Sequence, residues 1–556
     1  MTQNAGEFIA QLLRQEGLDR IFVLTGGDHD LWIALQEAGV QPMLARSEAS
    51  AIYMADGYAQ RSGKTGMSYG QGGPGAANVA AALADPFWSR TPLITLNGAN
   101  PESSNYRQQY QELNTDPMLE AVTFNSFRIS SASQLVTLLP RAIALARLNG
   151  PINISIPRDL FGKDVGKVSW PVPIPQLGGR AAPDPEAIAS AAQAIRAMKR
   201  PLIVAGTGAK RARVGDLILQ LAEVIGSTVA TSAGGKGVVP EGDERVTGVI
   251  GRYAGTASVS TASEADGLVV FGSRLGGLVT DGYRFPVDGG PVVQVDRDAE
   301  SLMIHSGPGV RVQADLELGL RALIDALGGH QISGETGEWR QRVVDRRRDW
   351  KEHVAGLPSY GQENQLRPHA VFPTLSSHAG EITLVADTGY MAAWASTLFE
   401  VRDPDGFFRA NGSLGWGFPA ALGVQSADPG RRVVCLSGDG GIGYHIGDME
   451  TAVRLGLPVI VVVLNNRGLA FEYHGQKYKF ENQIVPAVND LTDLDHSAVA
   501  RSFGWQGRRV GRLEDFDAVL NEALADRETP WCIDVVIDRE DFAPITNFDG
   551  VLKRDI

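Results

Sequence analysis

Cysteine and basic charge are both scarce in this sequence. Its 556 residues include only two cysteines, Cys435 and Cys532, in no metal-like spacing. We therefore expect neither a disulfide framework nor a zinc site. Acidic residues outnumber basic ones, and the formal net charge is -13. Because nucleic acids and anionic membranes bind basic faces, we expect neither as a partner.

Long hydrophobic runs are also absent. The longest, LPVIVVVL from Leu457 to Leu464, has eight residues, whereas a membrane-spanning helix needs about 20. Its Val and Ile content predicts a buried parallel strand. The first residues, MTQNAGEFIAQLLRQEG, have the pattern of an amphipathic helix and lack the basic-then-apolar order of a signal peptide. These features predict a soluble cytoplasmic protein.

The sequence does contain a regular alternation of short apolar runs with helical patterns. Several runs end in Gly, Asp or Asn, as strands do where they feed ligand loops at the carboxyl edge of a doubly wound sheet. The alternation predicts an α/β fold. Nine of the runs are RIFVLTGG, PLITLNG, PINISIP, PLIVAGTG, GLVVFGS, PVVQVD, ITLVADTG, RVVCLSGDGG and PVIVVVLNN.

Two stretches interrupt this alternation. Residues 168–187 are rich in Pro and Gly and indicate a linker, whereas residues 328–368 are polar and charged, with a helical pattern in their centre. The breaks leave three α/β blocks. We therefore predict three doubly wound parallel-sheet domains, at residues 1–166, 187–328 and 367–545.

A basic cluster lies inside the second break. Arg346, Arg347 and Arg348 are consecutive, and Asp345 and Asp349 flank them. Mixed charge of this kind indicates a solvated helix face rather than an anion-binding patch.

An acidic residue and an amide follow two of the apolar runs. VVCLSGDGG places Asp439 in a glycine turn, and VIVVVLNN places Asn466 27 residues later. The intervening helix and strand form one crossover, so both side chains are expected at one sheet edge. A glycine turn before a helix binds phosphate, and a carboxylate beside phosphate needs a cation between them. Oxygen ligands of this kind suit Mg²⁺.

The same stretch supplies further groups for this predicted site. The Gly468 carbonyl, two residues after Asn466, is a candidate third metal ligand. Each feature alone has a simpler interpretation, a capping Asp or a turn-forming Asn pair. Both at this spacing favour a metal–diphosphate site. Its cradle for the anion would be the turn Gly438, Asp439, Gly440 and Gly441.

The stretch that begins GDG and ends NN resembles the diphosphate-binding motif of thiamine diphosphate (ThDP) enzymes. The resemblance extends over nearly the whole chain, to the superfamily of acetolactate synthase, pyruvate decarboxylase and benzaldehyde lyase. It implies a pyrimidine-binding domain, a central domain and a diphosphate-binding domain, with ThDP and Mg²⁺ as cofactors.

The resemblance also covers the N-terminal block. In MLARSEASAIYMADGYAQRSGKTG, Glu48 lies where the family has its activating glutamate, with Ser47 in place of the usual histidine. Its implied role is to hydrogen-bond the pyrimidine nitrogen N1′ and promote the imino tautomer, which removes the thiazolium C2 proton. Gln111 in YQEL resembles a glutamine near the thiazolium. The simpler interpretations are a first-turn helix acid and a loop amide.

Two further segments resemble cofactor contacts of the family. In NGSLGWGFPAALG, Leu414 lies where a bulky apolar residue bends the cofactor, and the Gly412 carbonyl would accept a hydrogen bond from its 4′-amino group. Gly389 and Tyr390 in ADTGYMAAW match a loop that touches the diphosphate. A core leucine is the alternative for Leu414.

Substrate choice is expected at two short places. Asp28 and His29 in TGGDHDLW are both candidate proton carriers, with Asp28 preferred. Glu472 in NNRGLAFEYHGQKY lies as in pyruvate decarboxylases, whereas His474 resembles benzaldehyde lyase. Polar loop residues and a polar helix face are the alternatives.

Some family features are missing. The paired histidines of pyruvate decarboxylases are absent from NYRQQYQELNTDPM, and YHGQ replaces the tryptophan-containing segment of acetolactate synthases. In the central block, VAGTGAKRA and FGSRLGG hold only a lone G-x-G, which is weak evidence for a nucleotide. FAD or ADP is therefore not the expected occupant there.

The resemblance implies an enzyme that acts on a small carbonyl substrate. The first hypothesis is an acetolactate synthase-like enzyme that decarboxylates a 2-oxo acid, or ligates it to a 2-hydroxy ketone, through a C2 carbanion. The alternatives are a benzaldehyde lyase-like enzyme, a 2-hydroxyacyl-CoA lyase, and a non-catalytic protein that binds ThDP or a nucleotide. Because family sites form between subunits, a homodimer is the implied minimum and a homotetramer is expected.

Overall fold

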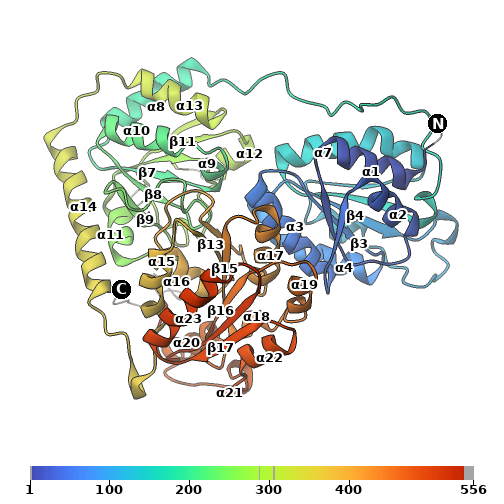
Figure 1. Ribbon diagram of the computed structural model, residues 1–556. Helices are drawn as coiled ribbons and strands as arrows, with labels where there is room; N and C mark the ends of the chain where they lie inside the picture. The colour runs from blue at the N-terminus through green and yellow to red at the C-terminus, as the bar shows by residue number, and fades with distance from the viewer. Residues whose placement is uncertain (1–2, 287–288, 305–306, 544–556) are drawn as a thin grey trace.

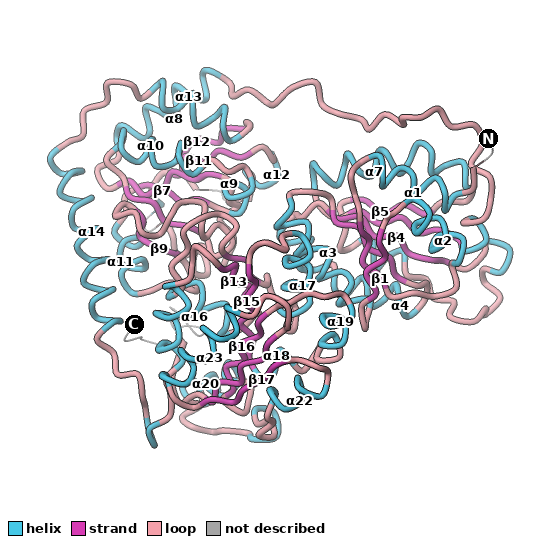
Figure 2. Tube along the Cα trace, viewed as in Figure 1, coloured by secondary structure: helices cyan, strands magenta, loops and turns pink. Residues whose placement is uncertain are grey.

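The computed structural model describes residues 3–286, 289–304 and 307–543. Within them the chain forms three six-stranded parallel sheets with helices packed around each (Figures 1 and 2). This confirms the predicted α/β fold of three parallel-sheet domains, and one sheet falls in each predicted range. The predicted end at residue 545 lies outside the described residues.

The N-terminal domain has the strand order β2-β1-β3-β4-β6-β5. Its apolar cluster includes Val172, so the chain stays on this domain slightly beyond residue 166. The strands are β1 (Arg20–Val23), β2 (Gln41–Leu44), β3 (Gly66–Gly70), β4 (Leu93–Ala99), β5 (Asn125–Arg128) and β6 (Ile152–Pro157). The helices are α1 (Ala5–Gln15), α2 (His29–Ala38), α3 (Glu48–Ser62), α4 (Pro74–Ala82), α5 (Ala84–Ser89), α6 (Asp116–Glu120) and α7 (Leu135–Asn149).

The central domain follows a long linker that runs past the top of the molecule in Figure 1, and its strand order is β12-β11-β10-β7-β8-β9. Its strands are β7 (Pro201–Ala205), β8 (Thr228–Thr231), β9 (Val246–Val249), β10 (Gly267–Phe271), β11 (Val292–Asp296) and β12 (Gly309–Gln313). Its helices are α8 (Pro185–Ala197), α9 (Thr207–Arg211), α10 (Gly215–Ile225), α11 (Thr256–Glu264), α12 (Ala299–Leu302) and α13 (Leu316–Ala326).

One long helix, α14 (Gly334–Ala355), lies in the second sequence break and descends along the edge of the molecule (Figure 1). The prediction that its arginines form a solvated face is wrong for Arg347. That guanidinium is buried and donates to the backbone carbonyls of Glu241 and Val246. Local charge pattern could not reveal these acceptors, because they lie about 100 residues away in the chain.

The C-terminal domain has the order β14-β13-β15-β16-β18-β17, and its chain reverses direction across the sheet between β13 and β15. Ligands bind at such switch points, beyond the carboxyl ends of the strands. The strands are β13 (Ile382–Ala386), β14 (Phe407–Arg409), β15 (Arg432–Gly438), β16 (Ile460–Asn465), β17 (Gln506–Val510) and β18 (Trp531–Val536). The helices are α15 (Phe372–Ser377), α16 (Tyr390–Leu398), α17 (Gly417–Ala427), α18 (Asp439–Ile442), α19 (Asp448–Arg454), α20 (Ala470–Lys479), α21 (Pro486–Asn489), α22 (His496–Ser502) and α23 (Leu513–Ala525).

Helices α3 and α17 join the N-terminal and C-terminal domains. A Cβ atom at Gly57 would lie 2.2 Å from the Ala420 carbonyl oxygen, and one at Gly423 would lie 1.9 Å from that of Met54. Only glycine fits either position, so two glycines permit the close approach of these helices.

The LPVIVVVL run forms the buried strand that its sequence predicts, since every residue of β16 is buried. Cys435 and Cys532 are both buried and free. Among the described residues, no helix combines the length and apolar character that crossing a membrane requires.

Candidate active site

The ends of β15 and β16 bring the predicted metal residues together. These strands are parallel neighbours, with Gly438 opposite Leu464. Asp439 begins α18, Asn466 follows β16, and both are buried. The Gly468 N–H donates to Asp439 Oδ2 at 2.8 Å, which holds the loop after β16 against the glycine turn. The juxtaposition expected from the crossover is therefore present.

The chemistry of this pair suits a hard cation. Burial raises the pKa of the Asp439 carboxyl from 3.8 to about 6, partly offset by the Gly468 N–H. A cation beside the carboxylate would remove that penalty. The described residues hold no cluster of three or more His, Cys, Asp or Glu side chains that could bind a metal. An ion at Asp439 and Asn466 would therefore complete its oxygen shell with ligand and water, as Mg²⁺ does with phosphates.

A cavity of about 330 Å³ opens in front of this pair. Gly389, which precedes α16 and has a φ of +72°, lies at the rim of this cavity with its backbone uncovered by any side chain. Most of the predicted cofactor residues line it: Gly389, Tyr390, Leu414, Gly438, Asp439, Gly440, Gly441, Asn466 and Gly468. Gly412 is not among the lining residues and lies exposed, two residues before Leu414.

Asp387 was missed by the sequence reasoning and holds the walls of this cavity together. It lies at the end of β13, is 1% exposed, and accepts hydrogen bonds from Thr388 N at 2.8 Å and Ser437 Oγ at 3.1 Å. It also accepts from Gly415 N at 3.1 Å, beside Leu414. Burial raises its carboxyl pKa to about 6. Its strand-end position in ITLVADTG was the one available signal.

The N-terminal candidates gather at the carboxyl edge of their own sheet. Glu48 starts α3, is 7% exposed, and accepts a hydrogen bond from Asn78 Nδ2 at 3.0 Å. Gln111 Oε1 accepts from Gln71 Nε2 at 2.9 Å. A Cβ atom at Gly75 would lie 2.8 Å from Glu48 Oε1, so the first turn of α4 lies against the predicted activating acid.

Asp28 and His29 have opposite environments. Asp28 is 3% exposed and directly precedes α2. Its side chain makes no capping hydrogen bond, and neither of its carboxylate oxygens has a hydrogen-bond partner among the described residues. Burial raises its pKa to about 7. His29 is exposed at the start of α2. Asp28 is thus the group suited to exchange a proton near neutral pH, although the role of each stays a prediction.

Replacing Asp28 by asparagine is expected to stabilise the protein above neutral pH. Because its folded-state pKa is raised, ionised Asp28 destabilises the fold, and this loss grows from pH 4 to pH 7 and then levels. Asp28→Asn should gain about 1–3 kcal/mol at pH 8. Thermal unfolding across this pH range measures it, with the exposed Glu37→Gln as charge control, because Asp30 itself contributes to the raised pKa of Asp28. A gain independent of pH would contradict the account.

The two candidates in α20, Glu472 and His474, also lie in different environments. Glu472 lies in the first turn, is exposed, and lines the cavity. His474 is fully buried behind the cavity wall, where its Nδ1 lies 2.9 Å from the Tyr390 hydroxyl and its ring stacks on Tyr390. Burial lowers its pKa to about 4. A neutral imidazole that positions Tyr390 fits this geometry better than a side chain that contacts substrate.

The two halves of the predicted site do not share one cavity within the chain. The described lining of the diphosphate cavity comes from the C-terminal domain and from Tyr253 of the central domain. Glu48, Gln111 and Asp28 belong to the separate N-terminal group. A complete site with both halves therefore needs a second copy of the chain or a domain movement.

The glycine loops of the central domain also meet at a cavity. It measures about 530 Å³ and is lined by Gly208 of VAGTGAKRA and by Gly272 and Arg274 of FGSRLGG. Two acids at the end of β11 and just after it, Asp296 and Asp298, also line this cavity. That neither FAD nor ADP is the expected occupant of the central domain stays a prediction.

Three models of thiamine pyrophosphate enzyme domains match the chain. They are the N-terminal TPP binding domain over residues 3–118, the central domain over 188–323 and the C-terminal TPP binding domain over 387–535. Together they span most of the sequence and match the three sheets in order. The chain belongs to the ThDP-dependent enzymes of the acetolactate synthase and pyruvate decarboxylase superfamily.

Particular relatives are similar over most of their length. A probable acetolactate synthase large subunit from Methanocaldococcus jannaschii is 26% identical, over 99% of this chain and 94% of the relative. An acetolactate synthase large subunit from Parasynechococcus marenigrum is 29% identical, over 95% and 86%. A sulfoacetaldehyde acetyltransferase from Castellaniella defragrans is 27% identical, over 96% and 93%. The chain is thus acetolactate synthase-like.

Proposed function

We propose that this protein is a ThDP- and Mg²⁺-dependent enzyme that acts on a 2-oxo acid, by decarboxylation, by carboligation to a 2-hydroxy ketone, or by both. The observation that carries the proposal is the buried Asp439–Asn466 pair beside a glycine-lined cavity, with a buried Glu48 on the pyrimidine domain. The names of the similar acetolactate synthases favour the 2-oxo acid branch. The cytoplasm is its proposed location.

The chain's own groups have distinct proposed tasks. Bound ThDP would supply a nucleophilic carbon at C2 of its thiazolium ring. Asp439, Asn466 and the Gly468 carbonyl would hold the Mg²⁺ ion, while Gly438, Gly440 and Gly441 admit the diphosphate. Glu48 would hold a proton at the pyrimidine nitrogen N1′, and Leu414 would support the bent cofactor from below.

The groups at the rim would handle substrate protons. Glu472 lines the open side of the cavity in the first turn of α20. Asp28, whose pKa is raised by burial to about 7, can hold or release a proton near neutral pH. Gln111 would lie beside the thiazolium. The proposed substrate is a small carbonyl compound, which would approach from this open side when the cofactor occupies the cavity.

A direct test of the reaction is proton NMR of the purified protein with ThDP, Mg²⁺ and pyruvate, with and without benzaldehyde. Consumption of pyruvate to acetaldehyde, acetolactate, acetoin or a mixed hydroxy ketone supports the proposal and identifies the second step. Conversion of benzaldehyde to benzoin with pyruvate untouched would replace it with a lyase function. No turnover of either would favour an acyl-CoA substrate or a non-catalytic role.

We further propose a homodimer as the smallest active unit, within a homotetramer. The support is the separation of the Glu48 group from the Asp439 cavity in one chain. In a two-fold dimer, the pyrimidine domain of one subunit can face the diphosphate domain of its partner twice.

Mixing two inactive variants is expected to restore activity if the site forms between subunits. Heterodimers of Glu48→Gln and Asp439→Asn chains hold one site with both substitutions and one with neither. Random pairing would then return about a quarter of the wild-type rate. The measurement is turnover after joint refolding of the two chains, with each variant alone as the control. Activity that stays at the level of the single variants would place both residues in one subunit's site.

A further inference from the structure

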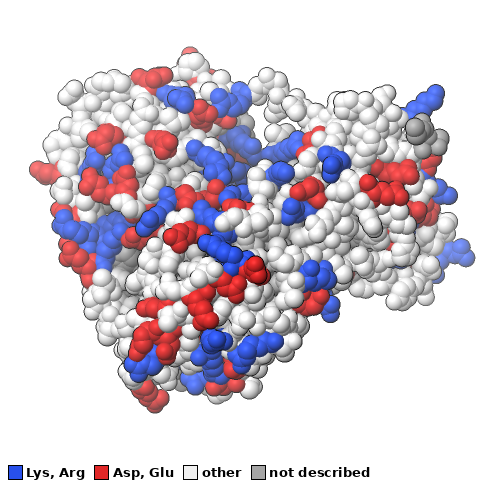
Figure 3. All heavy atoms as spheres, viewed as in Figure 1, with Lys and Arg blue, Asp and Glu red and all other residues white. Residues whose placement is uncertain are grey.

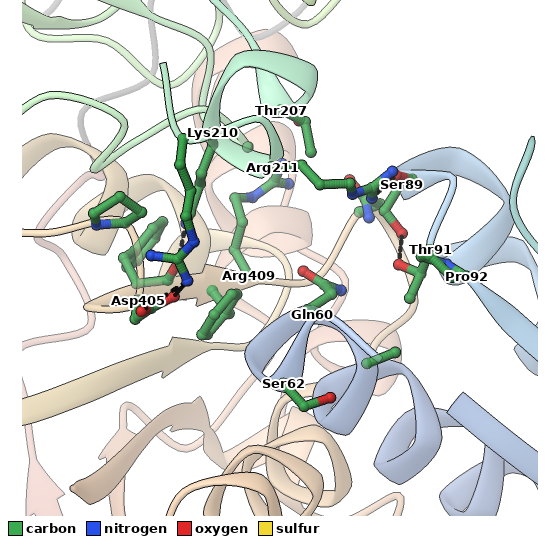
Figure 4. A pocket seen from close by; sticks show the side chains of 18 of the residues that line it. Gln60, Ser62, Ser89, Thr91, Pro92, Thr207, Lys210, Arg211, Asp405 and Arg409 are labelled. Carbon is green, nitrogen blue, oxygen red and sulfur yellow. Dashed lines mark hydrogen bonds and ion pairs between the residues drawn. The ribbon is translucent and has the colours of Figure 1, made fainter. Parts of the chain in front are cut away.

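A second cavity, distinct from the cofactor cavity, lies where the three domains meet. It measures about 200 Å³. Figure 4 shows Gln60 and Ser62 entering it from α3 of the N-terminal domain, Lys210 and Arg211 from α9 of the central domain, and Arg409 from β14 of the C-terminal domain. On the face in Figure 3, Lys and Arg side chains gather where the central domain meets the other two. Every domain therefore contributes to one cationic cavity.

Arg409 is the residue that needs an explanation. Its side chain is 7% exposed, and its Nε has no hydrogen-bond partner among the described residues. No described carboxylate forms an ion pair with it, and the face of the Tyr253 ring, 5.6 Å from the guanidinium carbon, satisfies none of its N–H donors. Buried charges are normally paired, because leaving one unpaired is strongly destabilising.

The nearby acids are already engaged. Asp85, the one carboxylate that favours the charge of Arg409, accepts hydrogen bonds from the backbone N–H groups of Asn411 and Ser413. Asp405 forms ion pairs with Arg213 at 2.8 Å and Arg61 at 3.4 Å. The described protein thus offers no free carboxylate to balance Arg409.

Lys210 is a second cation that forms no ion pair with a described carboxylate. Its ammonium donates to the backbone carbonyl of Phe407 and lies 4.7 Å from the centroid of the Phe408 ring. Neither group carries a negative charge. Burial lowers the pKa of Lys210 to about 7, although Asp405, which lines the same cavity, and Asp403 favour its charge. An anion in the cavity would stabilise Lys210 and Arg409 together.

We propose that this three-domain cavity binds a small oxyanion, namely phosphate or a phosphorylated small molecule, through Arg409 and Lys210. The planar guanidinium presents paired N–H donors that match phosphate oxygens, and lysine adds a compact charge. Gln60, Thr91 and Asn411 line the same cavity and provide neutral polar groups for the remaining oxygens. A volume of about 200 Å³ exceeds the share of a single water, about 30 Å³, several-fold.

The proposed site would connect the central domain to the catalytic one. Lys210 belongs to α9, and Arg409 ends β14, five residues before Leu414 at the cofactor cavity. An oxyanion held by both would tie these elements together. This proposal goes beyond the proposed reaction, because phosphate binding can be measured whether or not the enzyme turns over pyruvate.

The test is phosphate binding to protein already saturated with ThDP and Mg²⁺, so that the diphosphate cavity is filled. Calorimetry gives the affinity, and the melting temperature is followed against inorganic phosphate at constant ionic strength. The wild type is expected to melt at rising temperature as phosphate is added. Arg409→Met and Lys210→Met should each weaken phosphate binding by about tenfold or more, the loss typical of a charge-assisted hydrogen bond.

A matched variant separates this cavity from its larger neighbour. Arg274 lines only the 530 Å³ cavity and Lys210 only the 200 Å³ one, whereas Arg409 lines both. Arg274→Met should leave phosphate affinity unchanged. Loss of binding in Arg274→Met but not in Lys210→Met would overturn the proposal, and so would wild-type affinity in Arg409→Met.

A second measurement needs no ligand. In phosphate-free buffer, Arg409→Met should melt at or above the wild-type temperature, because it removes an unpaired buried charge. Arg432→Met is the contrast, since that buried guanidinium donates to the carbonyls of Ala523 and Thr529 at 3.0 and 3.1 Å. It should melt lower. A large loss of stability in Arg409→Met would mean that the protein itself satisfies Arg409, which would contradict the proposal.

Discussion

Replacing Glu48 by glutamine is expected to lower turnover by about 100- to 10,000-fold while ThDP binding changes little. Glutamine keeps the size of the side chain and can still accept the hydrogen bond that Asn78 donates at 3.0 Å. It cannot exchange a proton with the pyrimidine nitrogen. The loss should therefore appear in kcat rather than in the cofactor's dissociation constant, which fluorescence or calorimetric titration would report.

The control for this prediction is the same chemical change on an exposed surface. Glu37 lies on the solvent side of α2, so Glu37→Gln removes one charge without touching the site. It should keep the wild-type rate. If Glu48→Gln also kept that rate, the activating role of Glu48 and the proposed reaction would both fall. If ThDP binding were lost together with turnover, Glu48 would be a binding group instead.

Most interior strands were predictable because both of their faces are buried. All nine apolar runs named from the sequence form interior strands. The named runs include neither the interior strands β3, β8 and β18 nor any of the six edge strands of the described sheets. An edge strand has one neighbour and partial exposure, so its sequence lacks a continuous apolar run: β2 is QPML and β5 is NSFR.

The juxtaposition of Asp439 and Asn466 was predictable from chain geometry, whereas the contacts that support it were not. One strand–helix–strand crossover fixes Asp439 beside Asn466 whatever surrounds them. The network of Asp387 joins the end of β13 to Ser437 of β15 and to Gly415 before α17, which no local pattern records. For the same reason, sequence could not show that His474 is buried behind Tyr390, or that Arg409 Nε has no hydrogen-bond partner in the part of the chain that the structure describes. Burial is a property of the whole fold.

Replacing Asp439 by asparagine is expected to weaken ThDP binding at fixed Mg²⁺ by about 100-fold or more, since even groups that only orient a metal ligand contribute 10- to 100-fold. Asparagine can still accept the 2.8 Å hydrogen bond from Gly468 N–H, so the loop after β16 should stay in place. What would be lost is the charge that we propose holds the cation against the diphosphate. Titration of ThDP at several Mg²⁺ concentrations measures this loss.

The same substitution should leave the cofactor-free protein equally or more stable, which separates loss of the site from loss of the fold. Because burial raises the folded-state pKa of Asp439 from 3.8 to about 6, its charge destabilises the empty fold as pH rises through that range. Asp439→Asn should therefore gain about 1–2 kcal/mol at pH 8.

Asp448→Asn is the matched control, because that buried carboxylate accepts hydrogen bonds from Arg46 N and Ser50 Oγ at 2.9 and 2.5 Å. It should lose stability yet keep its response to Mg²⁺. Unchanged ThDP binding in Asp439→Asn would contradict the proposal that a metal ion binds at the glycine turn.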